Sequence, residues 1–240
     1  MKAGFISNTL TEIKALYVFL IIASASIIIS NCLFLIPDEQ ILIKLGDGNG
    51  LIESMTAMML FLTSLIFLFL FSKNKYIIYL FLSMLFFVGA GEETSWGQQY
   101  LNIKTPEYFL DNNVQSELTI HNLEIFNPDE SGGIHKIGIG SLLTFDFLYK
   151  IFWLMFGIVL PLAYVYLNPI KRIADKIKIP LAPVSIGIFF MISWGIYRLL
   201  HTLILPDGMS PQYYETATEI YEYNSSLLFL LISISFLKKS

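Results

Sequence analysis

The sequence predicts an all-α integral membrane protein, a polytopic transmembrane bundle of about six helices with an interfacial amphipathic helix on the outer side. Three observations favour this fold class. Of 240 residues, 55% are hydrophobic and only 14% are charged. The mean hydropathy is +0.65, and this composition is far from that of an average soluble domain. Several apolar runs approach the roughly 20 residues that cross a bilayer core, and short connections separate them, so we expect residues 1–240 to form a single membrane domain.

Each expected helix is bounded by charged residues, proline or glycine. The first apolar run follows Lys14 and ends before Pro37. It is too long for the apolar part of a signal peptide, so we interpret it as an uncleaved helix. Pro161 predicts a kink in the fourth helix, and the last apolar run is short, so its helix must begin upstream. We therefore expect helices over 15–36, 51–71, 76–96, 139–167, 181–205 and 214–237.

The longest polar segment, 98–138, separates the third and fourth expected helices. Within it, Phe109, Leu110, Val114 and Leu118 predict a short amphipathic helix that lies at the membrane surface. We expect a polar, glycine-containing connection before the second helix and a basic loop after the fourth. Polar side chains are therefore concentrated between the apolar runs.

The distribution of lysine and arginine predicts the orientation of the chain. If the N-terminus is cytoplasmic, six crossings place most of the basic residues inside and most of the acidic residues outside, as the positive-inside rule requires. We therefore expect a multi-pass protein of the cytoplasmic (inner) membrane with both termini in the cytoplasm. The lipid bilayer is its expected partner. A nucleic-acid role is disfavoured because the outer side has no basic patch, and homo-oligomerisation stays open.

Polar side chains occur at outer-leaflet depth in five of the six expected helices. Charged groups at this depth are costly, so lipid would not tolerate them, and they mark functional-site candidates by default. We expect them to face inward around a cavity that opens to the outside. The residues are Glu53, Glu92, Glu93, Asp146, Lys150, Arg198, His201 and the acidic face Glu215, Glu219 and Glu222.

Five of the polar residues are candidates for catalysis: Glu53, Glu92, Glu93, His121 and Arg198. A carboxylate near apolar surroundings suits a general base or a metal ligand, a histidine suits acid/base work, and an arginine suits an anionic substrate group. Structural roles are the alternative. The carboxylates can cap a helix, and Arg198 can form an ion pair with Asp146 that fixes helix packing. Alternatively, Lys150 can pair with Asp146, which lies four residues before it.

A metal site is a further candidate. Glu117 and His121 are four residues apart, which places them on one face of a helix, and with His201 they would form a three-ligand zinc set. The spacing is common by chance. Neither H-E-x-x-H nor C-x-x-C nor G-x-S-x-G occurs in the chain, so the motif that would identify a zinc or serine hydrolase is missing.

The polar motifs resemble those of an uncharacterised family of bacterial polytopic inner-membrane proteins. The resemblance rests on Asp47-Gly48 with Glu53, on G-E-E-x-S-W-G-Q at 91–98, on T-P-E at 105–107 and on N-x-Q-x-E-x-x-x-H-N at 113–122. It covers residues 47–122, and the glycine-rich turn at 47–50 departs from the pattern. The resemblance implies the polytopic fold and sharpens the site, but it implies no chemistry. A weaker comparison is to the alkaline ceramidase and adipose-receptor-like membrane hydrolases, which use membrane-embedded histidines, an acid and a serine around zinc. This chain lacks their paired late histidines, so the comparison is an analogy of chemistry only.

Three functions are compatible with these features. The first is a membrane-embedded hydrolase or transferase that acts on a lipid-like or envelope substrate. The second is a transporter or channel component with an acidic vestibule, although the inner halves of several helices contain few polar residues. The third is a non-catalytic membrane scaffold whose polar layer specifies packing. A one-sided cavity favours the enzyme.

Overall fold

The computed structural model describes residues 2–36, 38–46, 50–127, 129–130, 134–135, 138–200, 202 and 211–237. Within these residues the fold is all-α apart from one short antiparallel hairpin, in which Asp129 lies opposite His135. In chain order the elements are α1 (Lys2–Cys32), α2 (Glu39–Gly46), α3 (Leu51–Asn74), α4 (Ile77–Glu93), α5 (Gln98–Leu101), α6 (Glu107–Asn112), β1 (Asp129–Glu130), β2 (Ile134–His135), α7 (Phe145–Leu154), α8 (Leu160–Tyr166), α9 (Asn168–Ile177), α10 (Val184–Leu199) and α11 (Pro211–Leu237).

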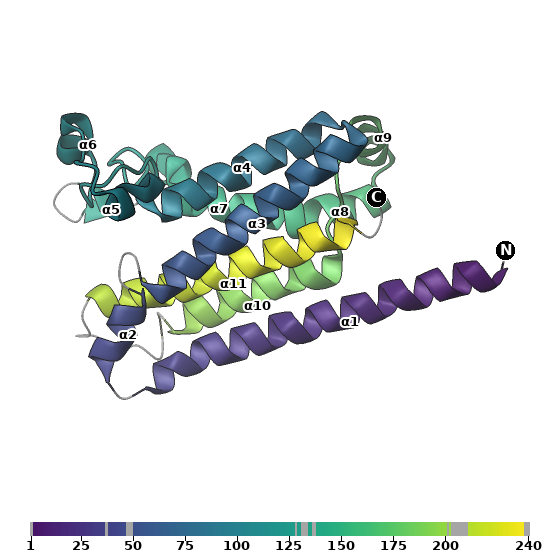
Figure 1. Cartoon of the computed structure of the whole chain (residues 1–240), viewed down its shortest axis with the longest axis horizontal. Coiled ribbons are helices and arrows are strands. Elements are labelled where there is room, and N and C mark those ends of the chain that lie inside the picture. Colours follow the sequence, from purple (N-terminus) through teal and green to yellow (C-terminus); the bar gives the residue numbers. More distant parts are fainter. Residues whose placement is uncertain are drawn as a thin grey trace.

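The long helices run lengthwise between the same two ends of the molecule (Figure 1). Among the described residues, four helical segments are long and apolar enough to cross a membrane, one each in α1, α2 with α3, α7 with α8, and α11. Two further apolar helices are shorter: α4 has 17 residues and α10 has 16. The all-α class is therefore confirmed, together with four candidate membrane spans.

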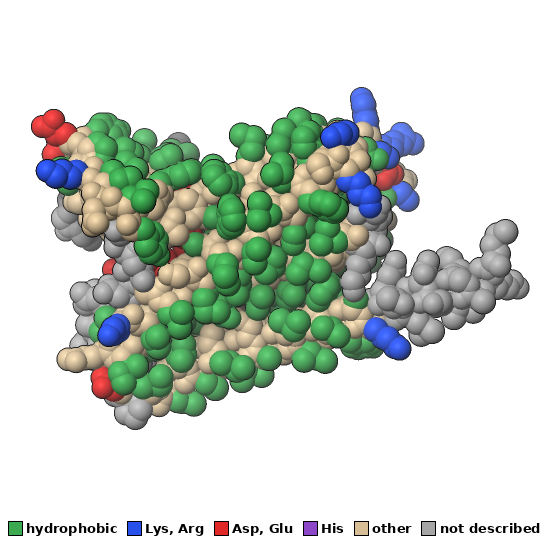
Figure 2. Space-filling view, in the orientation of Figure 1, with side chains coloured by type: hydrophobic (Ala, Val, Ile, Leu, Met, Phe, Trp, Pro, Cys, Tyr) green, Lys and Arg blue, Asp and Glu red, His purple; other side chains and the backbone are tan. Residues whose placement is uncertain are grey.

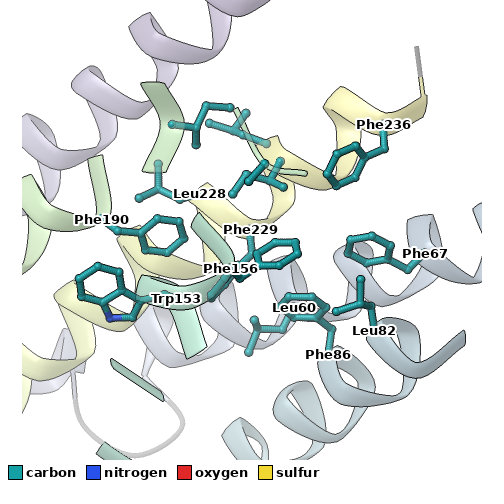
Figure 3. Packing of buried hydrophobic residues seen from close by; sticks show 14 of the residues in the cluster. Leu60, Phe67, Leu82, Phe86, Trp153, Phe156, Phe190, Leu228, Phe229 and Phe236 are labelled. Carbon is teal, nitrogen blue, oxygen red and sulfur yellow. The ribbon is translucent and has the colours of Figure 1, made fainter. Parts of the chain in front are cut away.

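Helix α11 is the central helix of the bundle. It contacts α3, α10, α2 and α1, and in Figure 1 it lies between α3 and α10. After its polar first turns, toward its C-terminus, α11 carries Leu228, Phe229 and Ile232, which are at most 1% exposed. The rings of Phe86, Phe156 and Phe190, among others, surround Phe229, as Figure 3 shows. These aromatic side chains form the core that holds the helices together.

Small and hydroxylated residues allow two close helix contacts. The Ser64 hydroxyl of α3 donates a hydrogen bond of 2.8 Å to the carbonyl of Ser83 in α4. A Cβ atom added to Gly187 of α10 would collide with the backbone of Gly157. Such contacts are typical of membrane helices, where dispersion and hydrogen bonding replace the hydrophobic driving force.

The fourth expected helix is divided by a π-helical segment. Met155–Val159 forms this segment between α7 and α8, and the buried Pro161 lies at the start of α8. Proline has no N–H group, and a wider turn before it removes the clash of its ring with the preceding carbonyls. The predicted interruption is thus present, but it is accommodated over several residues.

The connections differ most from the sequence expectation. The basic loop is in fact a ten-residue helix, α9, and the connection before α3 contains helix α2. The amphipathic helix expected over 109–118 is restricted to α6 (Glu107–Asn112), and residues 113–127 form turns and one bridge between Asn113 and Leu123. Local hydrogen bonds of the Asn113 side chain, which donates to the carbonyl of Thr119 and accepts from the N–H of Gln115, replace the helical ones there.

The described surface shows a broad apolar band between two polar ends. Figure 2 shows hydrophobic side chains covering the middle of the visible face, with most lysine and arginine side chains at the end where α9 lies. Exposed apolar side chains of α3 and α4 contribute to this band, including Phe61, Leu65, Phe81 and Phe87. A contiguous apolar surface of this kind is what a bilayer would cover.

Candidate functional site

The two adjacent glutamates at the end of α4 enter two different environments. Glu92 and Glu93 are the last two residues of that helix. Successive side chains of a helix point about 100° apart, so one faces the segment that follows α4 and the other faces α11.

Glu92 is a structural clamp for the following segment. Its side chain is 5% exposed. The Oε1 atom accepts a hydrogen bond of 2.8 Å from the indole Nε1–H of Trp96. The Oε2 atom accepts hydrogen bonds from the backbone N–H of Ile120 at 2.7 Å and of His121 at 2.9 Å, and lies 3.1 Å from His121 Nδ1. Both oxygens are therefore occupied, and charge-assisted hydrogen bonds of this kind are the strong ones.

A tight turn after α4 allows this clamp to form. Ser95, Trp96 and Gly97 all have positive φ angles, of 45°, 54° and 77°, which reverse the chain and bring the indole back over the helix. A Cβ atom at Gly91 would lie 2.8 Å from the Trp96 ring. The glycine therefore provides the space that the tryptophan fills.

The remaining motif residues hydrogen-bond with one another. We call residues 95–127 the cap. Ser95 donates to Glu117 Oε2 at 2.6 Å, the Gln98 side chain accepts from the N–H of Leu118 at 2.6 Å, and Asn122 donates to Gln115 at 2.6 Å. The rings of His121 and Phe126 pack edge-on against Phe145 of α7. The motif thus builds a folded cap that is joined to α4 and α7.

Glu93 belongs to a cluster of three carboxylates, the Glu triad. Its partners are Glu219 and Glu222, which lie three residues apart on one face of α11. One oxygen atom from each of the three side chains lies within 4.8 Å of the other two, and all three residues are partly buried. The Oε2 atom of Glu219 is buried and has no hydrogen-bond partner in the part of the chain that the structure describes.

The surroundings of the triad add further charge. Glu53 of α3 interacts electrostatically with all three carboxylates, and Asp146, Lys150 and His121 act on Glu222 in the same way. Two unit charges 4 Å apart repel by about 4 kcal/mol near a protein surface. Three ionised carboxylates in this volume therefore require protons or a cation between them.

Aromatic side chains lie next to the triad, on the side toward the C-terminus of α11. Tyr221 of α11 stacks on Tyr197 with ring centroids 5.1 Å apart and meets Tyr149 edge-on at 6.2 Å. Tyr149 in turn contacts Phe229, two helical turns beyond Glu222. The triad is thus followed along α11 by tightly packed rings, which fill the interior toward the other end of the bundle.

The structure brings several of the predicted polar residues together. Asp146 forms an ion pair of 2.6 Å with Lys150, and Arg198 has an exposed side chain; the expected ion pair between Asp146 and Arg198 is replaced by this local one. Glu53 and His121 lie within electrostatic range of the triad. His201 falls outside the described residues.

The zinc set of Glu117, His121 and His201 stays a prediction, because His201 lies outside the described residues. Residues 113–127 are not helical, so the four-residue spacing does not place Glu117 and His121 on a common face. Glu117 accepts a hydrogen bond from Ser95 and His121 contacts Glu92, which are the interactions of a cap. Residues 113–127 are not helical because asparagine-based turns outcompete the helix in this segment.

Glu219 and Glu222 belong to the acidic face that the sequence predicts at outer-leaflet depth, but they are not among the five residues that it favours for catalysis. The signal was present, because both glutamates occur in a helix whose later part is almost entirely apolar. The sequence could not show that this face meets Glu93 of α4.

No family model, curated protein or solved structure matches this chain.

Proposed function

We propose that this chain is an integral membrane hydrolase or transferase that acts on a lipid-like or envelope substrate, and that a divalent cation held by Glu93, Glu219 and Glu222 forms its reaction centre. The observation that carries the proposal is the Glu triad itself, with a buried and unpartnered Glu219 oxygen. A cation would neutralise the mutual repulsion and provide the missing partner at once.

The donor set favours a hard cation. Carboxylate oxygens suit Mg²⁺, Mn²⁺ and Ca²⁺, whereas zinc sites are rich in histidine and cysteine. A bound cation supplies Lewis-acid chemistry, since it polarises a carbonyl or phosphoryl oxygen and activates water. The chain's own groups complement it. The Lys150 ammonium attracts an anionic substrate group, and His121, whose Nδ1 faces Glu92, keeps its second ring nitrogen for proton transfer.

The position of the triad supports a lipid-like substrate. Glu219 and Glu222 are part of a candidate membrane span, and α3 and α4 beside them expose apolar surface that a bilayer would cover. A substrate that partitions into the bilayer can therefore approach from the side, with its polar group at the triad. We also propose that α4 and α10 cross the membrane, which gives six crossings with both termini in the cytoplasm and agrees with the distribution of lysine and arginine.

A cation transporter is the second candidate, and one observation favours it. Buried polar residues continue along α11 beyond the triad, namely Asn224, Ser225, Ser226, Ser233 and Ser235. Each of these serines, however, donates to a backbone carbonyl of its own helix, and the rings around Phe229 fill the space between them. The packing thus favours a site that opens to one side only.

The experiment compares purified wild-type protein in liposomes of phosphatidylethanolamine and phosphatidylglycerol, with and without Mn²⁺, and follows released headgroups and acyl chains by mass spectrometry. We expect Mn²⁺-dependent turnover that Glu93→Gln abolishes. Glu107→Gln, an exposed glutamate of α6, is the matched control and keeps full activity. Equal product from wild-type and Glu93→Gln protein would refute the enzyme, and Mn²⁺ uptake into sealed liposomes would support the transporter instead.

A further inference from the structure

Helix α9 combines a basic face with an apolar face at one end of the bundle. The apolar face contains Ile170, Ala174 and the half-exposed Ile173 and Ile177. These four residues recur at helical spacing, so they share one side. The opposite side carries the exposed Lys171, Arg172 and Lys176, Lys178 follows directly, and Asp175 is the one acidic residue of the helix.

Contacts with α8 fix the position of this amphipathic helix. The hydroxyl of Tyr164 donates a hydrogen bond of 2.9 Å to Asp175 Oδ1, and the Lys171 Nζ atom lies 5.6 Å from the centre of the Tyr164 ring. Ala174 is buried at 3% exposure. The single acidic residue is thus used to attach α9 to its neighbour, and the basic side chains remain exposed.

The apolar face of α9 continues the surface of a candidate membrane span. That span ends at Tyr166, and α9 begins at Asn168 after the single residue Leu167. Val165, Tyr166 and Leu167 are all more than half exposed, and Ile173 is 54% exposed. If that candidate span crosses a membrane, α9 follows it where hydrocarbon gives way to headgroups. Figure 2 shows that other basic side chains gather at the same end.

From this geometry we propose that α9 is a binding site for anionic phospholipid headgroups. Lys171, Arg172, Lys176 and Lys178 contact the phosphates, and Ile173 and Ile177 enter the acyl boundary below them. A helix with a basic polar face and a separate apolar face binds membrane surfaces in this way, and clustered lysines and arginines favour anionic lipids. The binding site is independent of the Glu triad.

The test uses the full chain in nanodiscs. Cys32, which is the only cysteine, is replaced by serine, and Ile173→Cys carries an environment-sensitive fluorophore. We expect stronger quenching by brominated acyl chains in discs that contain phosphatidylglycerol than in discs of pure phosphatidylcholine. The difference disappears in 1 M KCl, because salt screens exposed charges within about 3 Å at that ionic strength.

Two variants separate headgroup binding from general charge effects. Neutralising Lys171, Arg172, Lys176 and Lys178 to glutamine removes the dependence on phosphatidylglycerol. Neutralising Lys44 and Lys104, which are exposed but lie outside α9, leaves it unchanged. Equal quenching in both lipid compositions would overturn the proposal, as would a fluorescence change with a soluble acidic peptide but not with phosphatidylglycerol.

Discussion

Glu92 and Glu93 are neighbours in the chain, yet their carboxylates have opposite surroundings, one in the cap and the other in the Glu triad. The cap surrounds Glu92 with four hydrogen-bonding groups. The triad surrounds Glu93 with other carboxylates. A buried charge that is fully paired contributes structure, whereas a cluster of like charges stores repulsion that a ligand can release. The comparison indicates that the conspicuous motif builds the fold and that the proposed site lies beside it.

The largest expected effect is the loss of the Glu92 clamp. We expect Glu92→Ala to lower the free energy of unfolding by roughly 3 to 5 kcal/mol, because it leaves the N–H groups of Ile120, His121 and Trp96 without their acceptor. Thermal unfolding in detergent micelles measures the change.

Glu93→Ala is the matched control, since it removes the same side chain one residue further along. In metal-free buffer it relieves repulsion in the triad and leaves the unfolding midpoint unchanged or raised. If Glu93→Ala destabilised the protein as much as Glu92→Ala does, the division between clamp and site would be wrong.

The second effect is stabilisation by a cation. A ligand that binds only the folded state at 100 times its Kd adds about 2.7 kcal/mol to the free energy of unfolding. We therefore expect Mn²⁺ to raise the unfolding midpoint of the wild-type protein, and EDTA to reverse the shift. Glu222→Gln loses this response and Glu107→Gln retains it. If Mn²⁺ did not change the unfolding midpoint of the wild-type protein at any concentration, a cation at the triad would be ruled out.

The smallest effect concerns the space beneath Trp96. Gly91→Ala places a Cβ atom against the indole ring, and overpacking of this kind costs about 1 to 3 kcal/mol. Gly89→Ala is its control, because a Cβ atom there meets only Leu60 at 3.4 Å. We expect faster hydrogen exchange in the cap for Gly91→Ala alone, with Mn²⁺ affinity retained. Weakened Mn²⁺ binding would show that the cap also shapes the triad.

The sequence predicted the features that hydropathy and charge determine. The all-α class follows from the length and composition of the apolar runs, and the expectation that acidic groups of separate helices gather agrees with the meeting of Glu93, Glu219 and Glu222. The Asp146–Lys150 pair was expected from its four-residue spacing and is present.

What the sequence could not predict depends on tertiary contacts. Which of two adjacent glutamates faces α11 is set by helix rotation, and a difference of one residue reverses the assignment. The helix expected through Val114 and Leu118 is absent because Asn113 forms hydrogen bonds to the backbone around it. In α9, basic residues at short spacing suggested a loop, although their periodicity is helical.

Anomalous X-ray scattering from crystals of the protein grown with Mn²⁺ tests the central claim most directly. We predict one strong peak bonded to oxygens of Glu93, Glu219 and Glu222, at a distance close to the 2.0 to 2.6 Å range of hard divalent cations. The Glu92 carboxylate should keep its contacts with Trp96 and His121 in the same crystals. A peak at Glu92 and His121, or the absence of density at the triad under saturating Mn²⁺, would contradict the account.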